Sequence, residues 1–435
     1  MAVPVYKGKF TAAQADRLLW RAGFGPKRGE AAALAKKGLR NAVYSLTRPV
    51  SQELVGPAPV DDRGYPIAPY DATGHDHLWW LDRMVRTTAP LVERMTLNWH
   101  DWFATSLRGV GSQRLMLQQN ELLRKYALGS FGALLRDITA DGAMLRFLNG
   151  DKNTKNAPNE NYARELMELF SLGADRPGGY TETDVREQAR ALTGWRSSRV
   201  QGARDYTFSY VANRHDPGTK TVFGKSGAFA WEDSVRLCLE HPNHASFFVA
   251  KLWSYFVPIA PSKATQSALE SIYKSGYRVA PVVEAILMHP AFYTGPRMVK
   301  PPTVYAAGML RAVGRGIDTR SWVNLGLAAG QRLFLPPNVA GWDETQWLDT
   351  ATFRGRWYLA ATALGKSPAL APNGASATLL VERALAFWGR PPLGKASRDV
   401  LLRFAKRSIA RGRARGEIEA SLRQLIAAAP ELQTA

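Results

Sequence analysis

The chain has 435 residues, of which 46% are hydrophobic and 10% aromatic, enough to build one large globular domain or two ordinary ones. Its formal net charge of +20 permits a nucleic acid, an anionic membrane surface or an acidic polymer as partner, without choosing among them. Cys238 is the only cysteine, which excludes a disulfide framework and a cysteine metal cluster.

Helical periodicity dominates the first half of the chain. Thr11 precedes apolar residues at Ala15, Leu18 and Leu19, which predicts a capped helix over 11–23. A second helix is expected over 29–47, and Pro, Gly and Asp residues predict a long surface loop over 50–74. Further helices are expected over 75–86, 91–106, 112–128, 131–139, 159–172 and 181–192.

A period of two replaces the helical pattern after residue 203. The segment 205–211 alternates, and an Asp-Pro-Gly turn at 216–218 precedes Thr-Lys-Thr-Val-Phe-Gly at 219–224, so we predict a small inserted hairpin at about 203–224. Helices then resume at about 231–240, 244–256, 263–275, 280–288, 302–315 and 322–330. The expected fold is mainly α: a multi-helix globular domain, 1–367, with the inserted β-hairpin, and a basic helical unit, 375–435.

The acidic segment 157–172 is the first candidate for chemistry. Glu160, Arg164 and Glu168 lie at i, i+4 and i+8 and share one helix face, with Glu165 on an adjacent face. Two carboxylates that converge in a cleft can serve as general acid and base, one of them with a raised pKa. The alternative is a surface ladder of ion pairs, worth a few tenths of a kcal/mol for each pair. Gly173 is expected to end this helix.

The turn after the predicted strand carries His215, Asp216 and Lys220. The Asp-Pro-Gly turn explains Asp216 without a function, but it explains neither His215 nor Lys220. Thr181 with Asp184 fits a capping box, which favours a structural role for both residues.

Two aromatic segments supply further binding candidates. His100 lies beside Asp101 in an aromatic helix, but adjacent helical residues point about 100° apart, so Asp101 does not orient the imidazole directly. A buried, satisfied histidine fits His100 as well as a catalytic one. Trp342, in the Pro-rich loop 331–347, either stacks on a sugar ring or plugs the core.

Several familiar sites are missing from the sequence. It contains no Walker loop, no Gly-x-Gly-x-x-Gly after a strand, no Gly-x-Ser-x-Gly elbow and no His-Glu-x-x-His. His75 and His77 lack a third ligand of suitable spacing, so we predict neither a metal nor another cofactor. The basic run 395–415 predicts at most non-specific binding of nucleic acid. No run of 18 apolar residues and no leader is present, so we expect a cytoplasmic protein, with co-export beside a partner as its route to the envelope.

A set of short motifs in a fixed order resembles the bacterial family called "domain of unknown function 1800". The motifs are Trp-His-Asp-Trp-Phe-Ala-Thr-Ser from Trp99, Asn-Glu-Asn-Tyr-Ala-Arg-Glu-Leu from Asn159, Tyr-Thr-Glu-Thr-Asp-Val from Tyr180, His-Asp-x-Gly-x-Lys from His215 and Pro-Pro-Asn-Val-x-Gly-Trp from Pro336. The resemblance implies a largely helical fold and no established reaction. It also implies a possible partner, a sulfatase-like protein of the "domain of unknown function 1501" family.

The chain departs from the pattern of that family at two positions. Where many members have a second histidine after Trp-His-x, this chain has Trp102, and where many have Glu-Leu-His, it has Phe170. Because both histidines are replaced at once, we expect the two positions to be neighbours in the fold, and this is a second reason to predict no metal.

Two functions are compatible with these residues. The leading hypothesis is a hydrolase or lyase that acts on a carbohydrate-type or acidic polymer. In it Glu160, Glu165, His215 and Asp216 carry the chemistry. The substrate-binding residues are Arg164, Lys220, His100 and Trp342. The rival is a non-catalytic helical scaffold, or export companion of the sulfatase-like protein, in which the same charges are ion pairs and caps.

Overall fold

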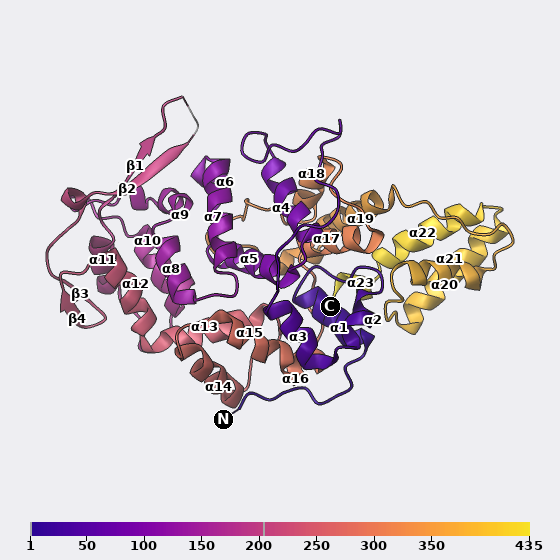
Figure 1. Ribbon diagram of the computed structural model, residues 1–435, viewed down its shortest axis with the longest axis horizontal. Coiled ribbons are helices and arrows are strands. Elements are labelled where there is room, and N and C mark those ends of the chain that lie inside the picture. The colour runs from indigo at the N-terminus through magenta and orange to yellow at the C-terminus, as the bar shows by residue number, and fades with distance from the viewer. Residues whose placement is uncertain (1, 203–204) are drawn as a thin grey trace. The chain divides into compact units, whose positions relative to one another are not determined.

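The computed structural model describes residues 2–202 and 205–435, and most of these residues are helical (Figure 1). The chain divides into two compact units that interleave along the sequence. Unit 1 takes in Val92–Phe292, Phe334–Trp342 and the start of the chain up to Tyr6. Unit 2 takes in Lys7–Leu91, Tyr293–Leu333 and Asp343–Ala435. The basic segment after residue 375 therefore belongs to unit 2, and the domain boundary expected before it remains a prediction.

Polar side chains begin many of the helices of unit 1. Ser112, Ser130 and Asp141 each accept a backbone N–H of the first turn that follows them, which satisfies a donor that the helix itself leaves unpaired. The helices are α5 (Pro90–Trp102), α6 (Leu107–Val110), α7 (Gln113–Lys125), α8 (Phe131–Thr139), α9 (Gly142–Phe147), α10 (Asn161–Glu165), α11 (Glu182–Ala191), α12 (Trp231–Glu240), α13 (Pro242–Ser254), α14 (Lys263–Lys274), α15 (Val279–Met288) and α16 (Pro290–Thr294), with short 3-10 turns η1 (Gly150–Lys152) and η3 (Ala212–Arg214). Helices α5 and α16 each run across a boundary between units.

The helix predicted over 159–172 changes type partway along. It is an α-helix only in α10, and continues as a π-helix, η2 (Leu166–Leu172). Gly173 ends it with φ +87°, a conformation that favours glycine, and a Cβ there would lie 2.8 Å from Arg176 Cδ. The helix stop expected at Gly173 is therefore confirmed, whereas the π-helix was not foreseen.

Two small antiparallel sheets accompany the helices, so the predicted fold class is confirmed. The strands pair differently from the expected hairpin: β1 (Trp195–Arg199) pairs with β2 (Tyr206–Tyr210), and β3 (Lys220–Val222) pairs with β4 (Lys225–Gly227). The segment after β2 therefore does not fold back on it. Residues 203–204, at the start of the predicted hairpin, lie outside the described residues.

Aromatic side chains fill the core of unit 1. Trp99, Trp102 and Phe131 are buried around Phe248, and the ring of Phe248 stacks on that of Tyr273 at 3.8 Å. Full burial of such a side chain contributes about 1.5–3 kcal/mol relative to exposure. This core fixes α5, α8, α13 and α14 relative to one another, and Cys238 is buried in the same unit, as its apolar setting predicts.

The helices of unit 2 come from three separate stretches of the chain. They are α1 (Ala12–Arg21), α2 (Glu30–Ala35), α3 (Gly38–Thr47), α4 (His75–Arg86), α17 (Pro302–Val313), α18 (Ser321–Ala328), α19 (Thr350–Leu364), α20 (Ala377–Phe387), α21 (Lys395–Ala410), α22 (Arg415–Ala427) and α23 (Pro430–Gln433), with the 3-10 turn η4 (Glu344–Leu348). Helices α20, α21 and α22 lie side by side (Figure 1) around their own apolar cluster, which includes Leu380, Leu401 and Leu422.

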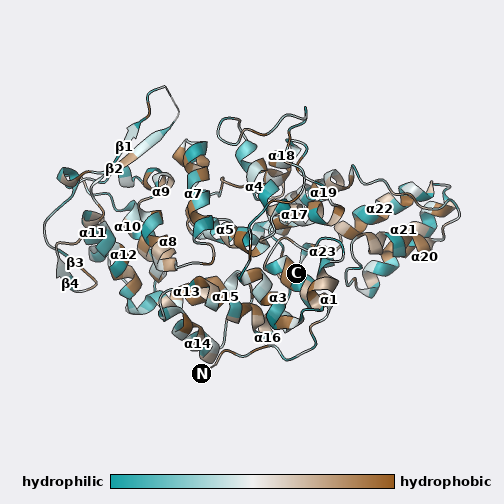
Figure 2. Cartoon of the chain, in the orientation of Figure 1, coloured by the Kyte–Doolittle hydropathy of each residue, from teal (hydrophilic) through white to brown (hydrophobic). Residues whose placement is uncertain are grey.

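Hydrophilic and hydrophobic residues alternate around the helices in both units, as Figure 2 shows along α7 and α21. This pattern is typical of helices that bury one face and expose the other. Within the described residues, no helix combines the length and the apolar character that crossing a bilayer requires.

Candidate functional site

The acidic helix presents an ion-paired face at its N-terminal end. Arg164 Nη1 lies 2.6 Å from Glu182 Oε1 at the start of α11, and Arg164 Nη2 lies 3.4 Å from Glu160 Oε2. Both carboxylates are well exposed to solvent, which screens the two ion pairs. The structure thus brings the predicted residues Glu160 and Arg164 together, and Glu182 joins them.

A polar cavity of about 300 Å³ lies beside this ion-paired face. Its side chains come from α10, η2, the loop after Gly173 and the start of α11. The polar residues that line it are Arg164, Glu168, Asp175, Arg176, Tyr180 and Glu182. Inside it, the Tyr180 hydroxyl donates to Glu168 Oε2 at 3.2 Å. Such a mixture of carboxylates, guanidinium groups and a phenol suits a hydroxylated or anionic substrate.

Glu165 lies in the last position of α10, one helical turn from Glu168, which lines the cavity. Partial burial raises the pKa of Glu165, and the neighbouring Glu168 carboxylate raises it further, against the lowering effect of Arg164. A carboxyl group with a raised pKa keeps its proton closer to neutral pH, which is what a general acid needs. Its catalytic role remains a prediction.

Four side chains from elsewhere in unit 1 hold the end of the π-helix next to this cavity. The last carbonyl groups of a helix lack partners within the helix, and here each of the last four accepts a side-chain donor. The pairs are Lys251 Nζ to Leu169 O at 2.9 Å, Trp102 Nε1 to Phe170 O at 3.1 Å, His244 Nδ1 to Ser171 O at 2.9 Å and Arg176 Nη1 to Leu172 O at 3.4 Å. π-Helices are rare and often occur at functional sites.

Arg176 also differs from Arg164 in its partners. Its guanidinium donates to two carbonyl oxygens, Leu172 O and Asn243 O at 3.2 Å, and to no carboxylate in the described part of the chain. A carbonyl oxygen is a dipole without net charge, so the positive charge of Arg176 is not cancelled by its bonds. It is therefore available to an anionic group in the cavity.

The second predicted group gathers at the C-terminal end of α11. Asp216 Oδ2 accepts from Arg190 Nε at 2.7 Å, and this bond holds the pKa of the Asp216 carboxyl below its usual range. The His215 ring lies with Nδ1 3.0 Å from Thr193 O. Lys220 is fully buried, and its ammonium group donates to the backbone oxygen of Asp216.

These two groups lie at opposite ends of α11. Glu182 contacts the Arg164 group and Arg190 contacts the Asp216 group, and eight residues of helix separate them. At 1.5 Å per residue this is a separation of roughly 12 Å along the axis. The residues that line the cavity beside Arg164 include none of His215, Asp216 and Lys220. Glu160 and Glu165 are not among them either, although both neighbour Arg164, which is.

His100 and Trp342 form a third group in unit 1. His100 is 1% exposed, and its ring lies 5.5 Å from the ring of Trp342. Burial lowers the pKa of His100 to about 3, so its imidazole is neutral near pH 7. Asp101, the neighbour of His100 in the chain, accepts from the Trp342 N–H at 2.8 Å and the Tyr255 hydroxyl at 2.9 Å. A substrate-binding role for His100 and Trp342 remains a prediction.

The two positions that depart from the family pattern are in contact. The indole N–H of Trp102 donates to the backbone oxygen of Phe170, and both side chains are buried. The expectation that these positions are neighbours is confirmed. In the described part of the chain, no group of three or more His, Cys, Asp and Glu side chains has a geometry that would hold a metal ion.

Of the six polar residues that line the cavity within the described ranges, sequence reasoning named only Arg164 as a site residue and missed five: Glu168, Asp175, Arg176, Tyr180 and Glu182. Glu168 was considered as part of the acidic face, but Arg176 and Tyr180 lie in a loop without helical periodicity. The signal for them was the glycine-rich stretch 173–179, because a turn next to a charged helix returns its side chains toward that helix.

Comparison with known proteins identifies one relationship. A family model described as "Protein of unknown function (DUF1800)" matches residues 17–434. No curated protein and no solved structure matches the chain.

Proposed function

Because the chain belongs to the DUF1800 family, whose description carries no activity, we propose a function from its own residues. We propose that it is a hydrolase or lyase that acts on a carbohydrate-type or acidic polymer at the cavity beside Arg164. The observation that carries this proposal is the adjacent pair Glu165 and Glu168, one with a raised pKa and the other lining the cavity.

In this proposal the two carboxyl groups divide the proton transfers. Glu165 donates its proton to the oxygen of the bond that breaks. Glu168 either activates a water molecule or takes up a proton from carbon, according to whether the bond breaks by hydrolysis or by elimination. Arg176 and Arg164, which both line the cavity, hold an anionic substituent of the polymer. The net charge of +20 draws a polyanion toward the protein.

The test is turnover of a polymer panel by Glu165→Gln. A uronic-acid polysaccharide, a sulfated polysaccharide and a neutral glucan are incubated with the protein. New reducing ends and the absorbance of unsaturated products are then measured. Glu165→Gln keeps the shape of the side chain but removes the transferable proton. We expect it to lower the rate about 100-fold or more while leaving Tm nearly unchanged.

Two further variants make this experiment specific. Glu232→Gln changes an exposed glutamate of α12 in the same unit and should leave the rate unchanged. Glu160→Gln tests Glu160, which the sequence predicts as a catalytic carboxylate together with Glu165. A fully active Glu165→Gln protein, or no turnover of any polymer by the unaltered protein, would contradict the proposal.

A second candidate is the non-catalytic companion of a sulfatase-like protein of the domain of unknown function 1501 family. It is favoured by the way the charges are satisfied within the chain: Arg164 pairs with two carboxylates, and Arg190 with Glu187 and Asp216. Purification of the tagged protein from its host, followed by mass spectrometry, separates the two candidates. Stoichiometric recovery of such a partner supports the companion, and recovery of the protein alone counts against it.

A further inference from the structure

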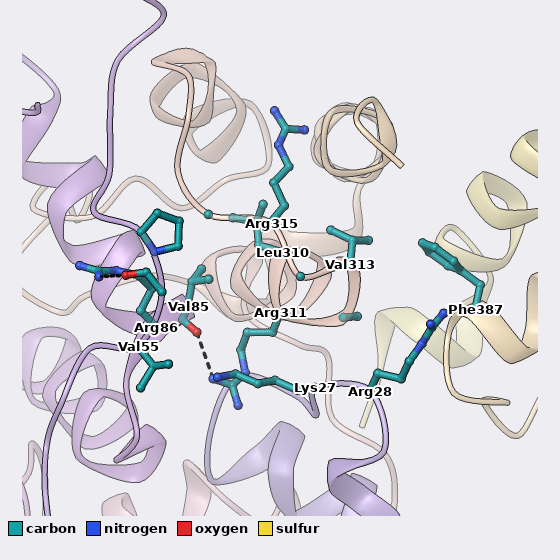
Figure 3. Close-up of a pocket in the computed structure, with 15 residues that line it drawn as sticks. Lys27, Arg28, Val55, Val85, Arg86, Leu310, Arg311, Val313, Arg315 and Phe387 are labelled. Atoms are coloured by element: carbon teal, nitrogen blue, oxygen red, sulfur yellow. Dashed lines mark hydrogen bonds between the residues drawn. The ribbon is translucent and has the colours of Figure 1, made fainter. Parts of the chain in front are cut away.

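A second cavity, of about 530 Å³, lies within unit 2 and is independent of the site proposed above (Figure 3). It is bordered by the loop before α2, the loop around Val55, the ends of α4 and α17, and α20. All the charged side chains that line it in the described part of the chain are cations: Lys27, Arg28, Arg86, Arg311 and Arg315.

Three of these cations are neutralised by carboxylates. The ion pairs are Arg86 with Asp82 at 2.9 Å, Arg311 with Glu30 at 3.2 Å and Arg315 with Asp318 at 2.6 Å. Lys27 and Arg28 form no ion pair within the described residues; Glu30 accepts the backbone N–H of Lys27 at 2.6 Å. Five cations against three carboxylates leave the cavity with an excess of positive charge.

The excess charge is concentrated around Lys27. Figure 3 shows the end of Lys27 beside the guanidinium of Arg311, which is 4% exposed and is fixed by bonds to Val85 O at 3.2 Å and Gly25 O at 3.0 Å. Partial burial lowers the pKa of Lys27, and the charge of Arg311 lowers it further, against the raising effect of Glu30. Two cations that repel one another at the edge of a cavity are stabilised when an anion binds between them.

The rest of the cavity wall is apolar. Val55, Val85, Leu310 and Val313 line it, and Phe387 of α20 lies at its far side, where the side chain of Arg28 reaches toward it (Figure 3). An inorganic anion would use the cations and leave this surface in water. A molecule with a hydrocarbon part would cover the surface, and each buried CH₂ group then contributes to affinity.

We propose that this cavity binds a small amphipathic anion, with its carboxylate or phosphate head group between Lys27, Arg28 and Arg311 and its hydrocarbon chain along Val313 and Phe387. Both parts of the ligand are required. A head group alone would leave the apolar wall in water, and a hydrocarbon chain alone would leave the cations at the edge without an anion. The two head groups share the same recognition chemistry, and the experiment tells them apart.

Isothermal titration calorimetry with four probes tests the proposal on the whole protein. Decanoate and decyl phosphate carry both halves of the ligand, decanol carries only the chain and inorganic phosphate only the charge. We expect at least one of the two amphipathic anions to bind about tenfold or more tightly than either half-molecule. Tighter binding of decanoate identifies a free carboxylic acid as the natural class of ligand, and tighter binding of decyl phosphate identifies a phosphate monoester.

Paired variants locate the site. Lys27→Gln with Arg28→Gln removes two exposed cations from the edge of the cavity, and we expect it to weaken binding about tenfold or more. Lys36→Gln with Lys37→Gln removes the same charge from exposed positions outside the cavity and should leave binding unchanged. Val55→Asp introduces a carboxylate at a side chain that is 54% exposed, where folding tolerates it, and should abolish binding by repulsion.

Three results would overturn the proposal. They are no binding of either amphipathic anion, equal binding of decanol and decanoate, and an equal loss of affinity in the two double variants. The last result would mean that the probes respond only to net charge.

Discussion

Gly341 lies so close to Asp101 that a side chain at this position would clash with it. Its φ is +93°, and a Cβ there would stand 2.3 Å from Asp101 Oδ1 and 2.8 Å from Asp101 O. The same carboxylate accepts the N–H of Trp342 and the hydroxyl of Tyr255. Asp101 therefore fixes the aromatic loop to α5 only because residue 341 has no side chain.

Gly341→Ala should therefore destabilise the protein by about 2 kcal/mol or more, the sum of a strained φ and a clash with the half-buried Asp101 carboxylate. Gly111→Ala is the matched control in the same unit: its φ is +72°, but nothing lies within 4 Å of the added Cβ. The Gly111→Ala variant should lose only about 1 kcal/mol of the free energy of unfolding. The free energy of unfolding of both variants, measured in urea, checks this difference, and equal losses would show that the contact with Asp101 contributes nothing.

The single residues of the candidate site were only partly predictable. Glu165 could be chosen from its position beside a second carboxylate, but the cause of its raised pKa is burial, which depends on chain segments far away in sequence. Arg176 was missed because its position follows from the path of a glycine-rich loop. Local patterns identify charged groups, and only tertiary packing decides which of them keep an uncancelled charge.

At the scale of elements, the π-helix η2 depends on donors that come from other helices. Leu169 O, Phe170 O and Ser171 O each accept a buried or half-buried side chain of α5 or α13. Without such donors, the unpaired carbonyl groups would be costly to bury. The π conformation is therefore a property of the packed unit, which explains why the period of the sequence predicts an ordinary helix there.

Trp102→Phe tests this dependence. The variant keeps an aromatic ring but leaves Phe170 O without its indole donor, so we expect a loss of about 1–3 kcal/mol beyond that of the smaller ring. Trp322→Phe is a suitable control: Trp322 is fully buried, and its indole nitrogen has no hydrogen-bond partner within the described residues. If both variants lose the same free energy of unfolding, the bond to Phe170 does not stabilise the π-helix.

The elements with strong local signals were predicted well. Thr11 and Thr181 begin α1 and α11 with capping boxes, and α4 has the expected bounds, 75–86. One local pattern misled. The helix expected over 29–47 is split into α2 and α3 before Gly38, which has φ +73°, a conformation that an uninterrupted helix does not contain.

At the scale of the whole molecule, buried histidines make stability depend on pH. Burial lowers the pKa of His77 and His100 to about 3 and that of His244 to about 4. His244 illustrates the cause: its Nδ1–H donates to Ser171 O, and its Nε2 accepts the Tyr273 hydroxyl, so a second proton has no place. Because the unfolded chain binds protons at these groups below about pH 6.5, it is favoured as the pH falls.

His244→Gln should make this dependence shallower. The contribution of a neutral buried histidine is complete above about pH 6.5 and is lost as the pH falls toward 4, at about 1.4 kcal/mol per pH unit. Asp141, whose pKa burial raises to about 6, acts in the opposite direction, but it is present in both proteins and cancels in the comparison. Urea unfolding between pH 4 and 7 gives the two slopes, and equal slopes would mean that the pKa of His244 is the same in the folded and the unfolded protein.

Because the two units interleave along the sequence, translation completes the residues of unit 1 before those of unit 2. Unit 1 draws on no residue after Trp342, whereas unit 2 needs Lys7–Leu91 together with Asp343–Ala435. A ribosome therefore releases everything that unit 1 requires before it has made α19 to α23 of unit 2. Until then α17 and α18 lack α19, the helix on which both pack, so the nascent chain exposes their apolar faces and is a natural client for a chaperone at that stage.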